Sequence, residues 1–160
     1  MLIGVGNIYR CDDGVGIVVA RRIRDRLPAL SVVESAGEGA KLIDRWQSAD
    51  LVILVDAVRS GSTPGRVHRL DARTERIPSD FFNYSTHAFS VAEAVELSRA
   101  LDMLPAQLVI YGIEGRNFSA GSEISAEVAA AVDDVCRKIL VELSELEKVK
   151  PGETQEKSHA

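Results

Sequence analysis

The chain has 160 residues, of which 46% are hydrophobic, so it is long enough for one compact core and too short for two ordinary domains. Its formal net charge of −5 leaves no broad basic surface for phosphates, so no nucleic-acid partner is expected. Cys11 and Cys136 fit neither a disulfide framework nor paired zinc ligands, which favours a reducing, cytoplasmic setting. No apolar run reaches the ~18 residues of a membrane span, so no membrane partner or anchor is expected.

The first part of the chain alternates short apolar runs with helical patterns, which is typical of α/β proteins. Residues 2–6 predict a strand that ends in glycines, and apolar residues at helical spacing predict a helix over 15–27. A weak strand over 31–34 and a short helix over 40–46 follow. The apolar run Leu-Val-Ile-Leu-Val at 51–55 predicts a strand buried on both faces, as in parallel sheets.

The next segments predict strands and one long connection. Residues 65–70 follow a Ser-Gly-Ser-Thr-Pro turn with no helix between, which predicts an antiparallel strand at the sheet edge. Residues 71–86 predict a loop, and the apolar run at 107–111 predicts another strand. The sheet is therefore expected to be mostly parallel, with one antiparallel edge strand.

Two helices are predicted in the second half of the chain. Ser90 and Glu93 form a possible capping box for a helix to about residue 101, although Thr86 is an earlier alternative cap. Apolar positions from residue 125 onward predict a long amphipathic helix. The expected fold is a single-domain α/β three-layer sandwich over residues 1–147, with helices on both faces, followed by a mobile C-terminal tail over 148–160.

Two groups of acids stand where predicted strands end. The run Gly-Val-Gly-Asn-Ile-Tyr-Arg-Cys-Asp-Asp-Gly-Val-Gly, from Gly4 to Gly16, places Asp12 and Asp13 before a helix, where either could cap that helix or bind a ligand. Asp56 follows the apolar strand, at the end of the sheet where ligands bind in open α/β folds. A lone Asp there is more commonly a turn residue.

A histidine offers a third candidate position. His87 lies between the predicted loop and a helix, where it is either a structural residue or a metal ligand. If the strands are parallel, Asp13 and Asp56 lie at one sheet edge, and the helix that follows His87 could approach it. Carboxylates brought close together repel and need a cation, a shared proton or a basic partner, and a divalent metal with imidazole and carboxylate ligands would satisfy that need. His68 and His159 lack such a context.

A dinucleotide-binding module is the rival interpretation. Gly4 and Gly6 follow a strand, and Glu34 at the end of the next strand could bind a ribose. However, Tyr9 stands where the third glycine of the Gly-x-Gly-x-x-Gly pattern belongs. The two adjacent acids before the helix would also repel a pyrophosphate. These features make the rival the weaker interpretation.

The sequence resembles the nickel-iron hydrogenase maturation endopeptidases. Their pattern is Gly-x-Gly-Asn, four residues, Asp followed by Asp or Glu, and Gly-x-Gly, and residues 4–16 fit it throughout. Asp56 after an apolar strand and His87 before a helix also have counterparts in the family. The resemblance covers residues 1–146, and the three motifs together are specific.

The resemblance implies both an activity and a site. It implies an endopeptidase that cuts the C-terminal extension from a hydrogenase large-subunit precursor once nickel has been inserted. Asp13, Asp56 and His87 would contact the nickel, which the precursor supplies, so no resident cofactor is implied. Either nickel polarises the scissile carbonyl while a carboxylate activates water, or Asp13 and Asp56 act alone as an aspartic-type pair. A maturation chaperone that binds the precursor without cutting it is a further alternative.

Overall fold

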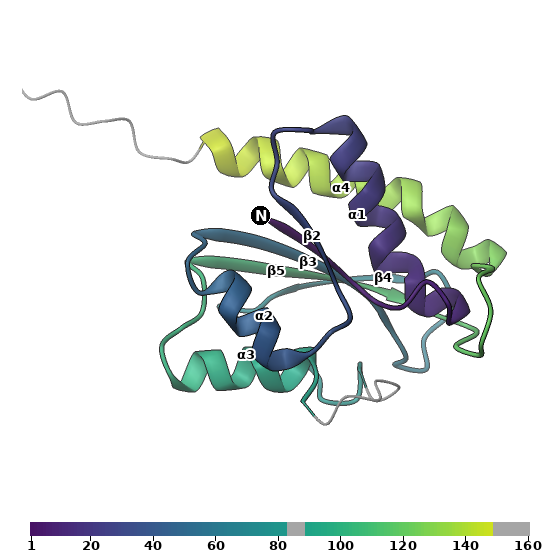
Figure 1. Cartoon of the computed structure of the whole chain (residues 1–160), viewed down its shortest axis with the longest axis horizontal. Coiled ribbons are helices and arrows are strands. Elements are labelled where there is room, and N and C mark those ends of the chain that lie inside the picture. Colours follow the sequence, from purple (N-terminus) through teal and green to yellow (C-terminus); the bar gives the residue numbers. More distant parts are fainter. Residues whose placement is uncertain (83–88, 149–160) are drawn as a thin grey trace, which may run out of the picture.

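The computed structural model describes residues 1–82 and 89–148. In this part of the chain, a sheet lies between two layers of helices (Figure 1). The strands, in sheet order β2-β1-β3-β5-β4, are β1 (Leu2–Val5), β2 (Val32–Ser35), β3 (Leu51–Val58), β4 (Val67–Asp71) and β5 (Gln107–Glu114). The helices are the 3-10 turn η1 (Cys11–Gly14), α1 (Val15–Arg26), α2 (Gly39–Trp46), α3 (Val91–Ala100) and α4 (Ala126–Lys148).

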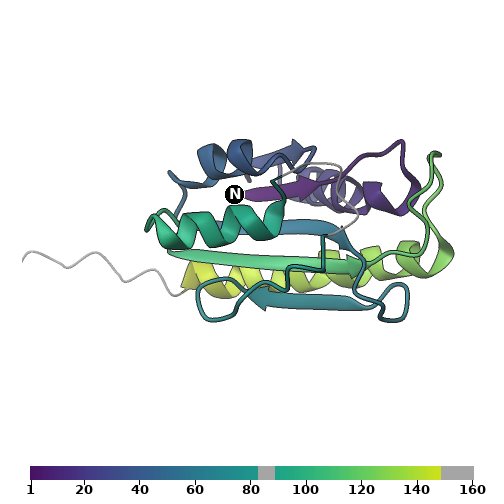
Figure 2. The ribbon, with the colours of Figure 1, turned by 90° about the horizontal axis from the view of Figure 1, so that it is seen from below.

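The sheet is parallel except at one edge. β1 pairs with β2 and with β3, and β3 pairs with β5, all in parallel. β4 runs antiparallel to β5 along the edge of the sheet (Figure 2). The predicted α/β class, the mostly parallel sheet and the antiparallel edge strand are therefore confirmed.

Both faces of the sheet are covered by helices, as predicted. α1 and α4 lie on one face, and α2 and α3 lie on the other (Figure 1). The buried side chains of β3 divide accordingly: Ile53, Val55 and Ala57 pack on the α1 and α4 side, whereas Val52, Leu54 and Val58 pack on the α2 and α3 side. Because strand side chains alternate, Asp56 faces the α2 and α3 side.

Two strands run further than the apolar runs that predicted them. β3 continues to Val58 and β5 to Glu114 because the two strands stay paired beyond the apolar residues, with Asp56 opposite Gly112 and Val58 opposite Glu114. Asp56 is therefore part of β3, and its interpretation as a residue of the following turn is wrong. The pairing of β3 with β1 ends one residue before Asp56, with Gly4 opposite Val55.

The helix boundaries agree closely with the sequence pattern. The capping box before α3 is confirmed, with the Ser90 N–H donating to Glu93 Oε2 at 2.9 Å; the alternative cap Thr86 lies outside the described residues. The predicted tail began at Lys148, which is instead the last residue of α4, and its remainder also lies outside the described part. Along residues 1–82 and 89–148, no helix has both the length and the apolar character needed to cross a membrane.

Two glycines of the first motif allow η1 and α1 to lie directly against the sheet. A Cβ atom on Gly16 would stand 2.3 Å from the carbonyl oxygens of both Val5 and Val55. Gly6 has a φ of +146°, and a Cβ atom there would stand 1.9 Å from the carbonyl oxygen of Asp13. These glycines therefore fix the approach of the acidic turn to β1 and β3.

Gly16→Ala tests this close approach. In an ordinary helix, replacing glycine by alanine stabilises the protein by up to about 1 kcal/mol. Here we expect a loss of about 1–3 kcal/mol, because the added methyl must push α1 away from two strands. Urea unfolding of both proteins measures the difference, and a variant more stable than the wild type would contradict the packing described.

Candidate active site

A cavity of about 460 Å³ lies at the carboxyl ends of β1 and β3. The chain leaves these neighbouring strands in opposite directions, since β1 leads through α1 to β2 while β3 leads to β4 on the far side of the sheet. Ligand sites in open α/β sheets form at such a reversal. The cavity is lined by Val5, Gly6, Asn7, Ile8, Arg10, Asp13, Ile17, Arg21, Glu34, Ser35, Ala36, Gly37, Asp56, Phe82, Ser90 and Val91.

Asp13 and Asp56 both line this cavity. Asp13 belongs to η1 and Asp56 to β3, and their exposed fractions are only 6% and 3%. His87, the third residue of the predicted site, lies outside the described residues. Within the described part of the chain, no three His, Cys, Asp or Glu residues form a group able to hold a metal. The structure thus brings two of the three predicted residues to one cavity.

The turn that carries Asp13 is held by a distant loop. The Cys11 N–H donates to the Gly121 carbonyl at 2.8 Å, and the Gly121 N–H donates to the Tyr9 carbonyl at 2.9 Å. Cys11 itself has a φ of +48°, an uncommon conformation for a residue with a side chain. Asp13 donates its N–H to the Arg10 carbonyl at 3.1 Å. This backbone network sets the direction of the Asp13 side chain.

Asp12 ties the acidic turn to the chain before α4. Its Oδ2 accepts the N–H groups of Arg116 and Asn117, both at 2.8 Å, and its Oδ1 accepts the Ser125 N–H at 2.7 Å. The Ser125 hydroxyl also donates to Oδ2 at 2.8 Å. Although burial alone raises the pKa of Asp12, the hydrogen bonds from Asn117, Ser125 and Arg116 outweigh it and hold the pKa below its ordinary value.

The interpretation of these acids as caps of the helix that follows them is wrong. No side chain caps the start of α1, whose N-cap residue is Gly14. Asp12 instead receives backbone donors from residues more than 100 positions away, the last of them immediately before α4. The two adjacent acids therefore have different roles: Asp12 holds the turn, and Asp13 faces the cavity.

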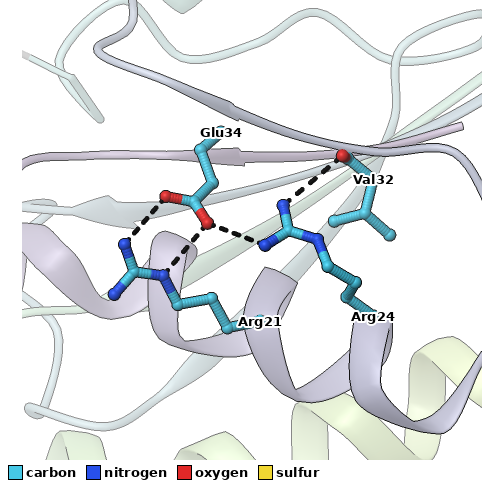
Figure 3. A network of polar contacts seen from close by, with 4 residues as sticks. All are labelled: Arg21, Arg24, Val32 and Glu34. Atoms are coloured by element: carbon cyan, nitrogen blue, oxygen red, sulfur yellow. Dashed lines mark hydrogen bonds and ion pairs between the residues drawn. The ribbon is translucent and has the colours of Figure 1, made fainter. Parts of the chain in front are cut away.

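A cluster of charged side chains forms one wall of the cavity. Glu34 of β2 lies between two arginines of α1 (Figure 3), with Arg21 Nε and Nη2 donating to its two oxygens at 3.0 and 2.9 Å. Arg24 Nη1 donates to Glu34 Oε1 at 3.1 Å. The hydrogen bond from Arg21 is the main cause that lowers the pKa of Glu34. Because both oxygens already accept these donors, Glu34 is poorly placed to bind a ribose, which disfavours the dinucleotide interpretation.

A second buried acid lies outside the cavity. Glu114, at the end of β5, accepts the N–H groups of Ser60 and Gly61 at 2.9 and 3.0 Å and the Ser60 hydroxyl at 2.7 Å. His68 Nε2 lies 3.4 Å from Glu114 Oε2. Glu114 therefore anchors the turn after β3. The sequence did not indicate it, because its hydrogen-bond donors, Ser60 and Gly61, lie more than 50 residues away.

Comparison with known proteins identifies the family. The profile of the hydrogenase maturation protease family matches residues 18–142, which include Asp56 and begin after Asp13. The hydrogenase 2 maturation protease of Escherichia coli K12 is 25% identical over 150 residues, which are 91% of this chain and 90% of the relative. The hydrogenase expression/formation protein HoxM of Cupriavidus necator is 25% identical over 141 residues, covering 84% of this chain and 69% of HoxM.

Solved structures show the same fold. An endopeptidase from Escherichia coli superposes with a TM-score of 0.74 at 23% identity, covering 90% of this chain and 92% of the other. The hydrogenase maturating endopeptidase HybD from Escherichia coli superposes with a TM-score of 0.67 at 20% identity, covering 90% and 91%. Since the family profile spans well over half of its length, this chain belongs to the hydrogenase maturation protease family.

Proposed function

We propose that this chain removes the C-terminal extension of a nickel-iron hydrogenase large-subunit precursor after nickel insertion. Membership of the family makes the chain a peptidase of hydrogenase maturation. The observation that carries the finer proposal is that two buried acids, Asp13 and Asp56, line one cavity at the reversal of the sheet. Such a cavity can receive an extended peptide together with a cation.

Nickel is part of the substrate in this proposal, and the protease has no resident cofactor. Asp13 and Asp56 offer carboxylate oxygens, and His87 is proposed as the third contact. The segment that carries His87 follows Phe82 and precedes Ser90, which both line the cavity. Oxygen and imidazole ligands without thiolates hold a divalent metal modestly. Nickel already bound by the precursor could therefore accept these ligands and bring the scissile bond into the cavity.

Hydrolysis requires a base and a route for one proton. We propose that Asp13 or Asp56 takes a proton from a water molecule as its oxygen attacks the scissile carbonyl carbon. The same carboxyl then gives that proton to the leaving nitrogen as the C–N bond breaks. The products are a mature subunit with a new C-terminal carboxylate and a released peptide with a free amine. Nickel supplies electrophilic assistance or positioning from the substrate side.

Mass spectrometry of the nickel-loaded precursor before and after incubation with the protease tests whether the chain cuts. We expect the precursor to lose one C-terminal peptide and the released peptide to appear in equal amount. Asp56→Asn serves as the inactive control, because it keeps the side-chain volume and removes the carboxylate. A stable complex with an uncut precursor would show a non-cleaving maturation chaperone instead.

A further inference from the structure

Two arginines line the cavity, and their guanidinium groups have different surroundings. Arg21 gives Nε and Nη2 to Glu34, so its charge is balanced within the protein. Arg10 is half-buried and lines the same cavity. Among residues 1–82 and 89–148, no side chain or carbonyl accepts a hydrogen bond or ion pair from its guanidinium. Arg10 therefore presents to the cavity a cation that no residue of the described structure pairs with.

The backbone of Arg10 is nevertheless firmly held. Its N–H donates to the Asn7 carbonyl at 3.1 Å, and its own carbonyl accepts the Asp13 N–H at 3.1 Å. Arg10 also forms a β-bridge with Gly121. The fixed backbone limits the region that the Arg10 guanidinium can reach, so its charge stays at the cavity.

A bound precursor would bury the Arg10 guanidinium, which would then need an anionic partner. A precursor that fills the cavity removes water from the Arg10 guanidinium, and an unpaired charge in such an interface weakens binding. Only an anion on the incoming chain offsets this cost fully, and a guanidinium pairs best with a carboxylate through two parallel hydrogen bonds. We infer that Arg10 is a specificity-determining residue that binds an acidic side chain of the precursor; this inference rests on the proposed function.

The spacing between Arg10 and Asp13 indicates where that acid lies. The Asp13 N–H donates to the Arg10 carbonyl at 3.1 Å, which closes a turn whose end Cα atoms lie within about 7 Å of each other, and both residues line the cavity. An extended peptide advances about 3.3 Å per residue. The acidic side chain is therefore expected about two to three residues from the scissile bond. Without Arg10, such an acid would still be repelled by the Asp13 and Asp56 carboxylates, and the other arginine of the cavity, Arg21, already pairs with Glu34.

Arg10→Gln is the direct test, with Arg45→Gln as the matched control. Arg45 is an exposed arginine of α2 and does not line the cavity. With nickel-loaded precursor, we expect Arg10→Gln to raise KM about 10-fold while kcat changes less than about twofold. Arg45→Gln should keep both constants, and the thermal unfolding of both variants should match the wild type. A wild-type KM for Arg10→Gln overturns the inference.

A charge swap identifies the partner. Each acidic residue within three positions of the cut is replaced in turn by arginine in the precursor, and each product is tested with wild type and with Arg10→Glu. One replacement should weaken cleavage by the wild type and restore it with Arg10→Glu. The inference fails if no replacement is rescued, or if no acid occurs within this range. The affinity of each variant for the precursor is measured in parallel by calorimetry. The role of Arg10 in binding is therefore tested even if the wild type binds the precursor without cutting it. That outcome would reject the proposed function and leave the inference about Arg10 to the affinity data.

Discussion

Replacing either cavity acid by its amide, Asp13→Asn or Asp56→Asn, is expected to slow precursor cleavage at least about 100-fold. Each substitution keeps the side-chain volume and removes both the negative charge toward the nickel and the capacity to take a proton. Single-turnover cleavage of nickel-loaded precursor measures the effect, and circular dichroism establishes that the variants fold.

The matched control for these variants is Asp44→Asn. Asp44 is an exposed residue of α2 and does not line the cavity, so its neutralisation should leave the cleavage rate unchanged. Equal loss of activity in Asp44→Asn would mean that overall charge, not the cavity acids, controls the rate. Cleavage at the wild-type rate by Asp13→Asn or Asp56→Asn would remove that residue from the active site.

Asp12→Ala is expected to have the largest effect on stability. Asp12 is fully buried, and its carboxylate accepts three backbone N–H groups and one hydroxyl. Removal of the carboxylate leaves these donors without an acceptor, which should cost at least about 3 kcal/mol of unfolding free energy. Ser125→Ala deletes only the hydroxyl donor and should cost about 1 kcal/mol. Equal stability losses in the two variants would contradict the central role of the carboxylate.

The same carboxylate predicts a pH dependence of stability. The pKa of Asp12 is lower in the folded protein than its ordinary value, chiefly because hydrogen bonds from Asn117, Ser125 and Arg116 outweigh the effect of burial. The ionised Asp12 carboxylate therefore adds its full share to the free energy of unfolding at pH values above its ordinary pKa, which is about 4. That share is lost as the pH falls through the lowered pKa of the folded protein. Asp12→Asn cannot titrate, so its stability deficit, followed by urea unfolding, should shrink toward acid pH. A constant deficit would show that the ionised form is not what stabilises the turn.

Most of the fold follows from local patterns in the sequence. The run at 51–55 is apolar at every position because β3 is covered on both faces, and the edge strand was recognisable because no helix separates it from β3. The strand ends were less predictable. β3 and β5 continue past their apolar residues because each supports the other's backbone hydrogen bonds, and that pairing has no local signature. The division into a domain over 1–147 and a tail stays a prediction.

The sequence likewise predicts some residues of the candidate site and not others. Asp13 and Asp56 could be recognised because acids at the ends of parallel strands meet at one sheet edge. The different role of Asp12 could not be recognised, since its partners at 116, 117 and 125 lie over 100 residues away. Arg10 gave no signal either, because a single arginine in a loop is usually a solvated surface residue. Its significance depends on the absence of a partner within the described structure.

The nickel dependence of cleavage tests the proposed mechanism most directly. The same large-subunit precursor is prepared with and without inserted nickel, and both forms are incubated with the wild-type protease while product is followed by mass. Because Asp13, Asp56 and His87 are proposed to engage nickel held by the precursor, we predict that only the loaded form loses its C-terminal extension. Cleavage of the nickel-free precursor at the same rate would contradict the mechanism.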